Sequence, residues 1–287
     1  MKEPNWVALP DGRRLCYATW GEPGGTPCFL FHGWPGSRLM GSVLHETCRD
    51  RGVRLIAPDR PGFGRSDPQP GRALTDWPVD VAALADALGL ERFGVVGISN
   101  GGPYALACGA LLPERLTGLA VVSGMGPAHQ EAARDTLASQ VRLTFALNTL
   151  SPLFSEVLVW ALAFGARVAP ALMASQMRMA APPPDRAVLA RPEVFDALKD
   201  EYAEAFYQGA DGLNQEIGLM RQRWGFALST IQGPVHLFHG EQDANVPVAL
   251  AQQVVAELSD PRPQFIDNAA HYWYVDHFDQ VLDALGM

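Results

Sequence analysis

The sequence predicts an α/β protein in which a mostly parallel sheet lies between two layers of helices and an all-helical segment is inserted. Short, fully apolar runs of strand length alternate with helical runs up to residue 125 and again after residue 225. Strands buried on both faces read as continuous apolar runs, so this alternation is typical of a covered parallel sheet. Residues 126–225 contain no convincing strand pattern. We therefore expect a core of residues 1–125 and 226–287 and a helical cap of residues 126–225.

The first part of the chain predicts a hairpin followed by alternating strands and helices. Strand-like residues 6–9 and 14–20 flank an Asp-Gly pair that is typical of a hairpin turn. The further expected strands are residues 28–31, 53–57, 93–96 and 116–122, and the expected helices are residues 39–51, 77–88 and 103–112. His32, Asp59 and Ser99 follow three of these strands, at the sheet edge where functional residues of parallel sheets gather.

The inserted segment is rich in Leu, Ala and Met, and the strand pattern returns directly after it. Its expected helices are residues 137–147, 155–167, 171–179 and 194–208, interrupted by the proline run of residues 181–184. The returning strands are residues 235–238 and 264–266, and helices are expected over residues 248–258 and 272–285. Because the sheet resumes, we interpret the helical segment as an insertion rather than a separate domain.

Composition and charge exclude several kinds of partner. The 287 residues are 48% hydrophobic, which is enough to bury a large core. A net charge of −9 without a Lys/Arg patch argues against nucleic acid. In the most apolar region, Glu156 and Arg167 bracket only ten uncharged residues, well short of the roughly twenty that span a bilayer. We expect a small-molecule substrate and no membrane anchor, and these residues give no indication of oligomeric state.

The cysteines and the N-terminal residues predict a reducing environment. Cys16, Cys28, Cys48 and Cys108 have neither the spacing of a metal site nor that of a disulfide framework. The first ten residues contain no apolar run typical of a signal peptide. We therefore expect buried free thiols, a cytoplasmic location and no metal or cofactor.

Gly97-Ile98-Ser99-Asn100-Gly101 joins an expected strand to an expected helix. A serine on so sharp a turn needs glycines two positions away, because a Cβ there would collide with the strand or the helix. The turn directs the first N–H groups of the new helix at the reacting group. A phosphate loop would need Lys-Ser/Thr after the last glycine, where this chain has Pro103-Tyr104. The motif alone also fits a plain turn, but its context favours Ser99 as a nucleophile.

A nucleophilic serine needs a base, and His271 is the best candidate among seven histidines. It follows the last expected strand, in a loop that precedes the closing helix. His32 and His239 begin loops and are expected to brace them. The remaining histidines are expected to be structural or exposed: His45, His129, His236 and His277.

The base needs an orienting carboxylate, for which Asp243 is favoured over Asp267 and Glu241. Asp243 lies in the loop after the penultimate strand. Asp267 is adjacent to a strand end and is expected in a turn, and Glu241 is expected to face solvent.

Together these motifs resemble the α/β-hydrolase superfamily from about residue 6 to residue 287. The chain order Ser99, Asp243, His271 is that of this superfamily. The motifs that carry the resemblance are His32-Gly33-Trp34-Pro35-Gly36, residues 59–66 (DRPGFGRS), Gly97 to Gly102, residues 240–243 (GEQD) and Ala270-His271. The resemblance implies an oxyanion hole made by the backbone N–H groups of Trp34 and Asn100. It also implies a serine hydrolase that forms an acyl-serine intermediate.

Sub-families of the superfamily differ at the nucleophile turn. Haloalkane dehalogenases and epoxide hydrolases carry Asp where this chain has Ser99, which disfavours both. Cofactor-free haloperoxidases usually have Met after the serine, C–C hydrolases Asn-Ser-Met-Gly, and proline iminopeptidases Gly-Gly-Ser-Trp-Gly, all unlike Ser99-Asn100. The expected activity is cleavage of a small apolar carboxylic ester. The alternatives are C–C bond or lactone hydrolysis on the same triad and, from a different class, a non-catalytic binding protein of the same fold.

The insertion gives a weaker indication of substrate, through side chains expected to line an apolar acyl pocket. These are Leu143, Phe145, Leu147, Leu150, Leu153, Phe154, Leu158, Trp160, Leu162, Phe164, Leu172, Met173, Met177 and Met179. Arg38, Arg178 and Arg223 are alternatives that would clamp a substrate carboxylate, but each is expected to be ion-paired or on the surface.

Overall fold

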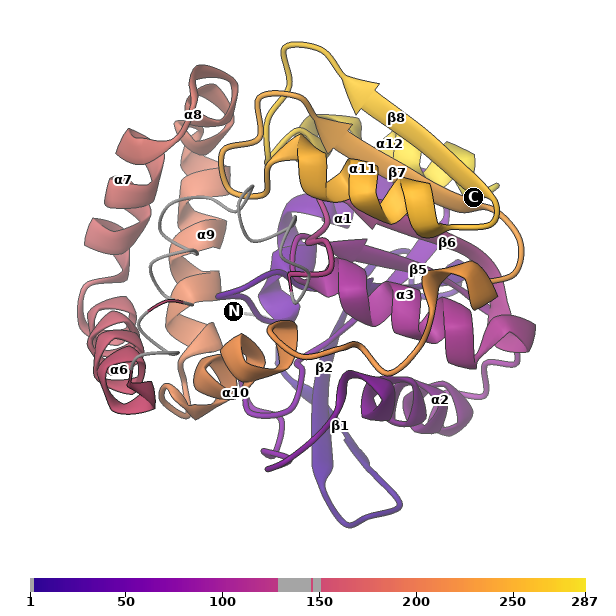
Figure 1. Ribbon diagram of the computed structural model, residues 1–287, viewed down its shortest axis with the longest axis horizontal. Coiled ribbons are helices and arrows are strands. Elements are labelled where there is room, and N and C mark those ends of the chain that lie inside the picture. Colours follow the sequence, from indigo (N-terminus) through magenta and orange to yellow (C-terminus); the bar gives the residue numbers. More distant parts are fainter. Residues whose placement is uncertain (1–2, 129–145, 147–150) are drawn as a thin grey trace.

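The computed structural model of the chain describes residues 3–128, residue 146 and residues 151–287, and its core is an eight-stranded sheet (Figure 1). The strand order is β1-β2-β4-β3-β5-β6-β7-β8. Pairs β1–β2 and β2–β4 are antiparallel and all other pairs are parallel. The strands are β1 (Asn5–Ala8), β2 (Arg14–Gly21), β3 (Thr26–Phe31), β4 (Val53–Pro58), β5 (Phe93–Ile98), β6 (Leu116–Val122), β7 (Val235–Gly240) and β8 (Pro261–Ile266). The predicted fold class is confirmed.

The central strand β5 is buried at every position, as its continuous apolar run predicts. The core helices cover the two faces of the sheet, with α2 packed on α3 and α1 on α12 (Figure 1). These helices are α1 (His45–Asp50), α2 (Trp77–Ala87), α3 (Gly101–Leu111), α11 (Val248–Glu257) and α12 (Tyr274–Ala284). The helix predicted over residues 39–51 is divided, because its first part, Arg38–Leu44, is a 3-10 helix.

Between β6 and β7 the described residues form helices and no strand. We call helices α6 to α10 the insertion; their bounds are α6 (Pro152–Val168), α7 (Pro170–Ala180), α8 (Pro183–Leu189), α9 (Pro192–Ala205) and α10 (Asp211–Met220). The helix predicted over residues 137–147 lies outside the described residues, apart from Ala146. Among the described helices none alone is long and apolar enough to cross a bilayer, although α6 and α7 together reach that length and composition across a 112° bend.

Helices α8 and α10 are absent from the sequence prediction, whereas the predicted interruption by the proline run is present at residues 181–182, between α7 and α8. Helix α8 starts inside that proline run, at Pro183. Proline is accepted in the first turn of a helix because the N–H that it lacks would have no intrahelical partner there. The proline run therefore begins a helix as well as ending one.

Candidate active site

Ser99 stands on a strained turn between β5 and α3. Its φ is 55°, in the left-handed region that few non-glycine residues adopt. A Cβ on Gly97 would lie 2.4 Å from the Gly101 carbonyl oxygen, and a Cβ on Gly101 would lie 2.1 Å from that of Phe31. The turn is fixed by the Ser99 N–H, which donates to the Val122 carbonyl at 2.9 Å. The two glycines are thus required by close backbone approach.

His271 and Asp243 meet beside this turn. His271 Nδ1 is 2.8 Å from Asp243 Oδ2. The other oxygen, Oδ1, accepts the backbone N–H groups of Asn245 and Val246, each at 2.8 Å. Both side chains are buried, whereas the competing acid Asp267 is exposed. Glu241, the second competitor, is exposed as well.

The surroundings of His271 favour its protonated form. Burial by itself would lower the pKa of His271, but the charge and hydrogen bond of Asp243, with a further contribution from Asp185, outweigh burial and raise the pKa. Such an imidazole is a stronger base, and it can hold a proton taken from a nearby hydroxyl.

Asp185 is a site residue that sequence analysis missed. It lies on α8, and its carboxylate accepts the backbone N–H groups of His271 at 3.1 Å and Tyr272 at 2.8 Å. An insertion helix therefore holds the loop that carries His271. The sequence analysis predicts no helix between residues 179 and 194, so nothing in it indicates that Asp185 would reach His271.

The other loop histidines brace the backbone, as predicted. His239 Nε2 is 2.7 Å from the Val246 carbonyl oxygen, and burial lowers the pKa of this ring. His32 Nδ1 is 2.8 Å from the Gly33 carbonyl oxygen, and burial places its pKa well below the usual value. Both imidazoles are therefore neutral supports at neutral pH. His129 lies outside the described residues.

The backbone around Ser99 offers two N–H groups. Among the described residues, neither the Trp34 N–H nor the Asn100 N–H donates a hydrogen bond. The loop that carries Trp34 lies against the serine, since a Cβ on Gly33 would be 3.1 Å from Ser99 Cβ. Both amides are therefore available to a bound group.

Ser99 and His271 line one cavity of about 670 Å³ between the core and the insertion. Of the apolar insertion side chains expected there, Leu162, Met173 and Met177 line it. Seven others are mainly exposed instead: Leu153, Phe154, Leu158, Trp160, Phe164, Leu172 and Met179. Leu143, Phe145, Leu147 and Leu150 lie outside the described residues.

No Lys or Arg belongs to the described lining of this cavity. Arg178 instead lies 5.3 Å over the ring of Phe195, and Arg223 is exposed. None of the three arginines considered as clamps therefore reaches a substrate in the described cavity. Among the described residues, no group of three His, Cys, Asp or Glu side chains could hold a metal ion. All four cysteines are buried free thiols, as predicted.

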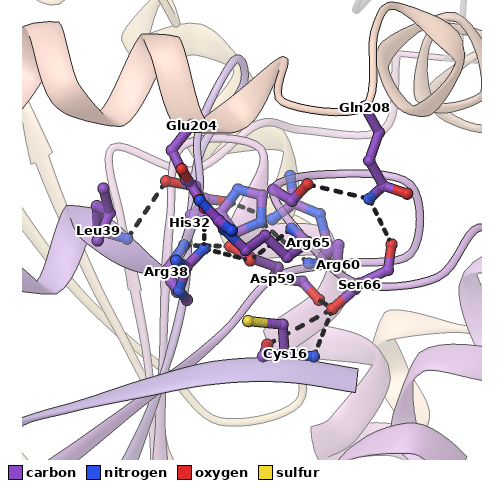
Figure 2. Close-up of polar contacts among 12 residues, drawn as sticks. Cys16, His32, Arg38, Leu39, Asp59, Arg60, Arg65, Ser66, Glu204 and Gln208 are labelled. Atoms are coloured by element: carbon purple, nitrogen blue, oxygen red, sulfur yellow. Dashed lines mark hydrogen bonds and ion pairs between the residues drawn. The ribbon is translucent and has the colours of Figure 1, made fainter. Parts of the chain in front are cut away.

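Arg38 is ion-paired beneath the site. Figure 2 shows Asp59, which accepts the Arg38 side chain at 2.8 Å and the Arg65 backbone N–H at 3.0 Å. Arg38 also donates to Glu204 of α9 at 2.7 Å, and Arg65 donates to the same glutamate at 2.6 Å. A Cβ on Gly64 would lie 2.2 Å from Asp59, so the loop closes only around glycine. The ion pairs of Glu204 with Arg38 and Arg65 therefore join the insertion to the core.

A second ion cluster joins α10 to the core next to Ser99. Glu216 lies 2.5 Å from Arg60 Nε and 3.1 Å from Arg72 Nη2. It also accepts the Tyr104 hydroxyl and the Asn100 side-chain amide, each at 2.8 Å. Burial alone would raise the pKa of Glu216, but the two guanidinium charges outweigh burial and lower it.

Similarity to known proteins identifies the family of this chain. A sequence family described as the alpha/beta hydrolase fold matches residues 26–278. The chain belongs to the α/β hydrolase fold family. A structure of a Pseudomonas aeruginosa hydrolase matches this α/β hydrolase with a TM-score of 0.71 and 21% identity, over 99% of each chain. An esterase of Thermogutta terrifontis matches with a TM-score of 0.69 and 22% identity, over 99% of this chain and 97% of its own.

Curated relatives match over shorter stretches. The non-heme chloroperoxidase of Streptomyces lividans is 36% identical over 123 residues, which are 42% of this chain and 45% of that one. A 2-hydroxymuconate semialdehyde hydrolase of Pseudomonas putida is 36% identical over 109 residues, which are 36% of this chain and 37% of that one. The matched part spans less than half of each of these relatives.

Proposed function

We propose that this α/β hydrolase cleaves a small, mainly apolar carboxylic ester through an acyl intermediate on Ser99. The observation that carries the proposal is the pair His271–Asp243 at 2.8 Å, in the same cavity as a serine held at a φ of 55°. We further propose that residues 126–225 act as a cap over this cavity, on a core of residues 1–125 and 226–287. A cytoplasmic location remains a prediction.

In the first half of the proposed reaction, His271 takes the Ser99 proton while the hydroxyl oxygen attacks the ester carbonyl. Asp243 holds Nδ1 and stabilises the imidazolium that forms. The alcohol leaves with a proton from His271, and the acyl group stays on Ser99. In the second half, water attacks the acyl-serine with His271 again as base, and the acid is released.

The negative charge on the carbonyl oxygen needs fixed donors, and we assign the Trp34 and Asn100 N–H groups to this role. Their lack of hydrogen-bond partners among the described residues supports the assignment. Losing one such donor typically lowers the rate by about a hundred- to a thousand-fold. Because both donors belong to the main chain, side-chain substitutions there should cost less activity than Ser99→Ala.

Cleavage of a C–C bond or a lactone by the same residues is the alternative function. The partial match to the 2-hydroxymuconate semialdehyde hydrolase favours it. An enol-lactonase structure from Burkholderia xenovorans shares the fold, with a TM-score of 0.69 and 17% identity over 99% of this chain and 100% of its own. C–C bond and lactone substrates would use the same serine and histidine. Only an activity assay therefore distinguishes these two reactions from ester cleavage.

The proposal is tested with p-nitrophenyl esters of increasing acyl length and a fluorophosphonate probe. We expect turnover of short and medium chains, covalent labelling of Ser99, and a loss of about 10⁴-fold or more in kcat for Ser99→Ala and His271→Ala. Labelling without ester turnover would favour the C–C or lactone alternative. An unlabelled serine and no turnover of any ester would leave a non-catalytic binding protein.

A further inference from the structure

One buried carboxyl group in the lining of the cavity has no role in the proposed reaction. Glu201 lies on α9 and lines the cavity that contains Ser99 and His271. Glu201 is 7% exposed, its Oε1 atom packs against the backbone at Gly36 and Ser37, and no described side chain donates a hydrogen bond to its carboxyl group. A buried carboxyl group without a side-chain donor is costly, and in the lining of a cavity it is a candidate contact for a ligand.

Glu201 and Ser99 contact the same short loop of the core. A Cβ on Gly33 would lie 3.1 Å from Ser99 Cβ, and a Cβ on Gly36 would lie 2.9 Å from Glu201 Oε1. Only Trp34 and Pro35 thus separate the glycine that contacts the serine from the glycine that contacts the carboxyl group. A substrate bound at Ser99 therefore lies within reach of Glu201.

The groups around Glu201 are neutral or negative. Tyr202, Tyr272 and Tyr274 also line the cavity, and burial raises the pKa of each, so all three hydroxyls stay protonated. The ring of the buried His32 lies on the same side of Gly36 as Glu201, since a Cβ on Gly36 would be 3.1 Å from His32 Nδ1, and burial places the pKa of this ring well below the usual value. The negative charge of Asp59 adds to the effect of burial on Glu201, and a hydrogen bond from the Ser37 backbone acts in the opposite direction. The result is a pKa raised to about 8.

We propose that Glu201 is a polar subsite in which a neutral carboxylic acid hydrogen-bonds a hydroxyl or ketone group carried by the substrate away from its scissile bond. The inference rests on the proposed function, because it concerns the specificity of the same cavity. An uncharged group is favoured over an acid or an ammonium. A substrate carboxylate would find no basic residue in the described lining, and an ammonium would require the buried acid to ionise.

The test compares matched esters that differ only in one polar group. On the acyl side these are p-nitrophenyl hexanoate, its β-hydroxy and ω-hydroxy derivatives, and its ω-trimethylammonio derivative. On the alcohol side, hexyl acetate is compared with ω-hydroxyhexyl acetate. The variants are Glu201→Leu, which removes the polar group, and Glu201→Gln, which keeps an uncharged one. Glu193→Leu is the control, because Glu193 is an exposed glutamate of the same helix and lies outside the described lining.

We expect at least one hydroxylated ester to exceed its plain partner in kcat/KM for the native protein. Glu201→Leu should reduce that preference about tenfold, the worth of one buried hydrogen bond, while leaving the plain ester unchanged or faster. Glu201→Gln should retain most of the preference, and Glu193→Leu all of it. An unchanged preference in Glu201→Leu, or a preference for the trimethylammonio ester in the native protein, would overturn the proposal.

A binding measurement separates this proposal from the proposed function. The same ester pairs are titrated calorimetrically into Ser99→Ala and into Ser99→Ala/Glu201→Leu, a readout that needs no turnover. If Ser99 is reactive but the pairs bind alike in both proteins, only the Glu201 subsite fails. If the native protein hydrolyses no ester while the hydroxylated members still bind better through Glu201, the proposed function fails and the subsite stands.

Discussion

Two contacts between the insertion and the core each bury a glutamate, but in opposite electrostatic surroundings. Glu216 of α10 is fully buried and meets two arginines, a tyrosine hydroxyl and an asparagine amide. Glu201 of α9 is almost as buried and meets no cation among the described residues. Accordingly, the pKa of Glu216 is lowered and that of Glu201 is raised to about 8.

The difference indicates which of the two glutamates holds the insertion to the core and which is left open to a ligand. A buried carboxylate with two guanidinium partners is a structural contact, because removing either partner leaves an uncompensated charge. A buried carboxyl group without a cation or a side-chain donor instead lowers stability in the absence of a ligand. Strained or unsatisfied groups of this kind are typical of functional sites.

The largest loss of stability is expected from removing Glu216, which is paired with Arg60 and Arg72. Glu216→Ala leaves Arg60 and Arg72 buried without their anion, so we expect the free energy of unfolding to fall by about 3–5 kcal/mol. Urea unfolding at pH 7 measures the change. Glu193→Ala, at an exposed position on α9, is the control and should change stability by less than about 0.5 kcal/mol. Equal effects of the two substitutions would contradict the comparison.

The contribution of Glu201 to the free energy of unfolding should depend on pH. Because the folded-state pKa of Glu201 is raised from 4.5 to about 8, its protonated form is favoured in the fold, and stability is lost as pH rises through this window. The expected slope reaches about 1.4 kcal/mol per pH unit. Urea unfolding of the native protein and Glu201→Gln between pH 5 and pH 9 measures it. Parallel curves for the two proteins would show that Glu201 ionises freely.

Substitution of Asn100 tests how closely the Glu216 ion cluster is coupled to the turn around Ser99. Its side chain donates to Glu216 at 2.8 Å, whereas its proposed role in the reaction belongs to the backbone N–H. Asn100→Ala should therefore lower the free energy of unfolding by about 2 kcal/mol, as expected for a buried hydrogen bond to a charge. The fall in kcat should stay well below that of Ser99→Ala. A loss of kcat as large as in Ser99→Ala, without a change in stability, would place the asparagine side chain in the chemistry.

Asp185 is an intermediate case, a buried insertion carboxylate whose hydrogen-bond donors are the backbone N–H groups of His271 and Tyr272. Its charge contributes to the raised pKa of His271, which must be neutral to act as base. Asp185→Asn should lower that pKa and move the acidic limb of the kcat/KM profile to lower pH. It should also lower kcat/KM about tenfold, because one N–H loses its acceptor. A pH–rate profile measures both effects, and an unmoved limb would leave Asp185 a purely structural role.

Local patterns in the chain are sufficient to predict the fold class and the candidate residues of the core. Ser99, Asp243 and His271 each follow a strand pattern directly, and the turn around Ser99 needs Gly97 and Gly101 at fixed spacing. Strand periodicity and turn chemistry act over a few residues, so they are readable in the chain. The fold prediction is confirmed, and the structure brings His271 and Asp243 together.

The insertion residues that meet the core depend on contacts between distant parts of the chain. Asp185 lies 86 residues from its partner His271, and Glu216 lies 156 residues from Arg60. No local period encodes such pairs, because they depend on how helices pack across the sheet edge. The same packing leaves Glu201 without a cation and turns most of the apolar side chains of α6 outward. Local chemistry therefore predicts the turn around Ser99, while long-range packing determines which polar groups surround the cavity.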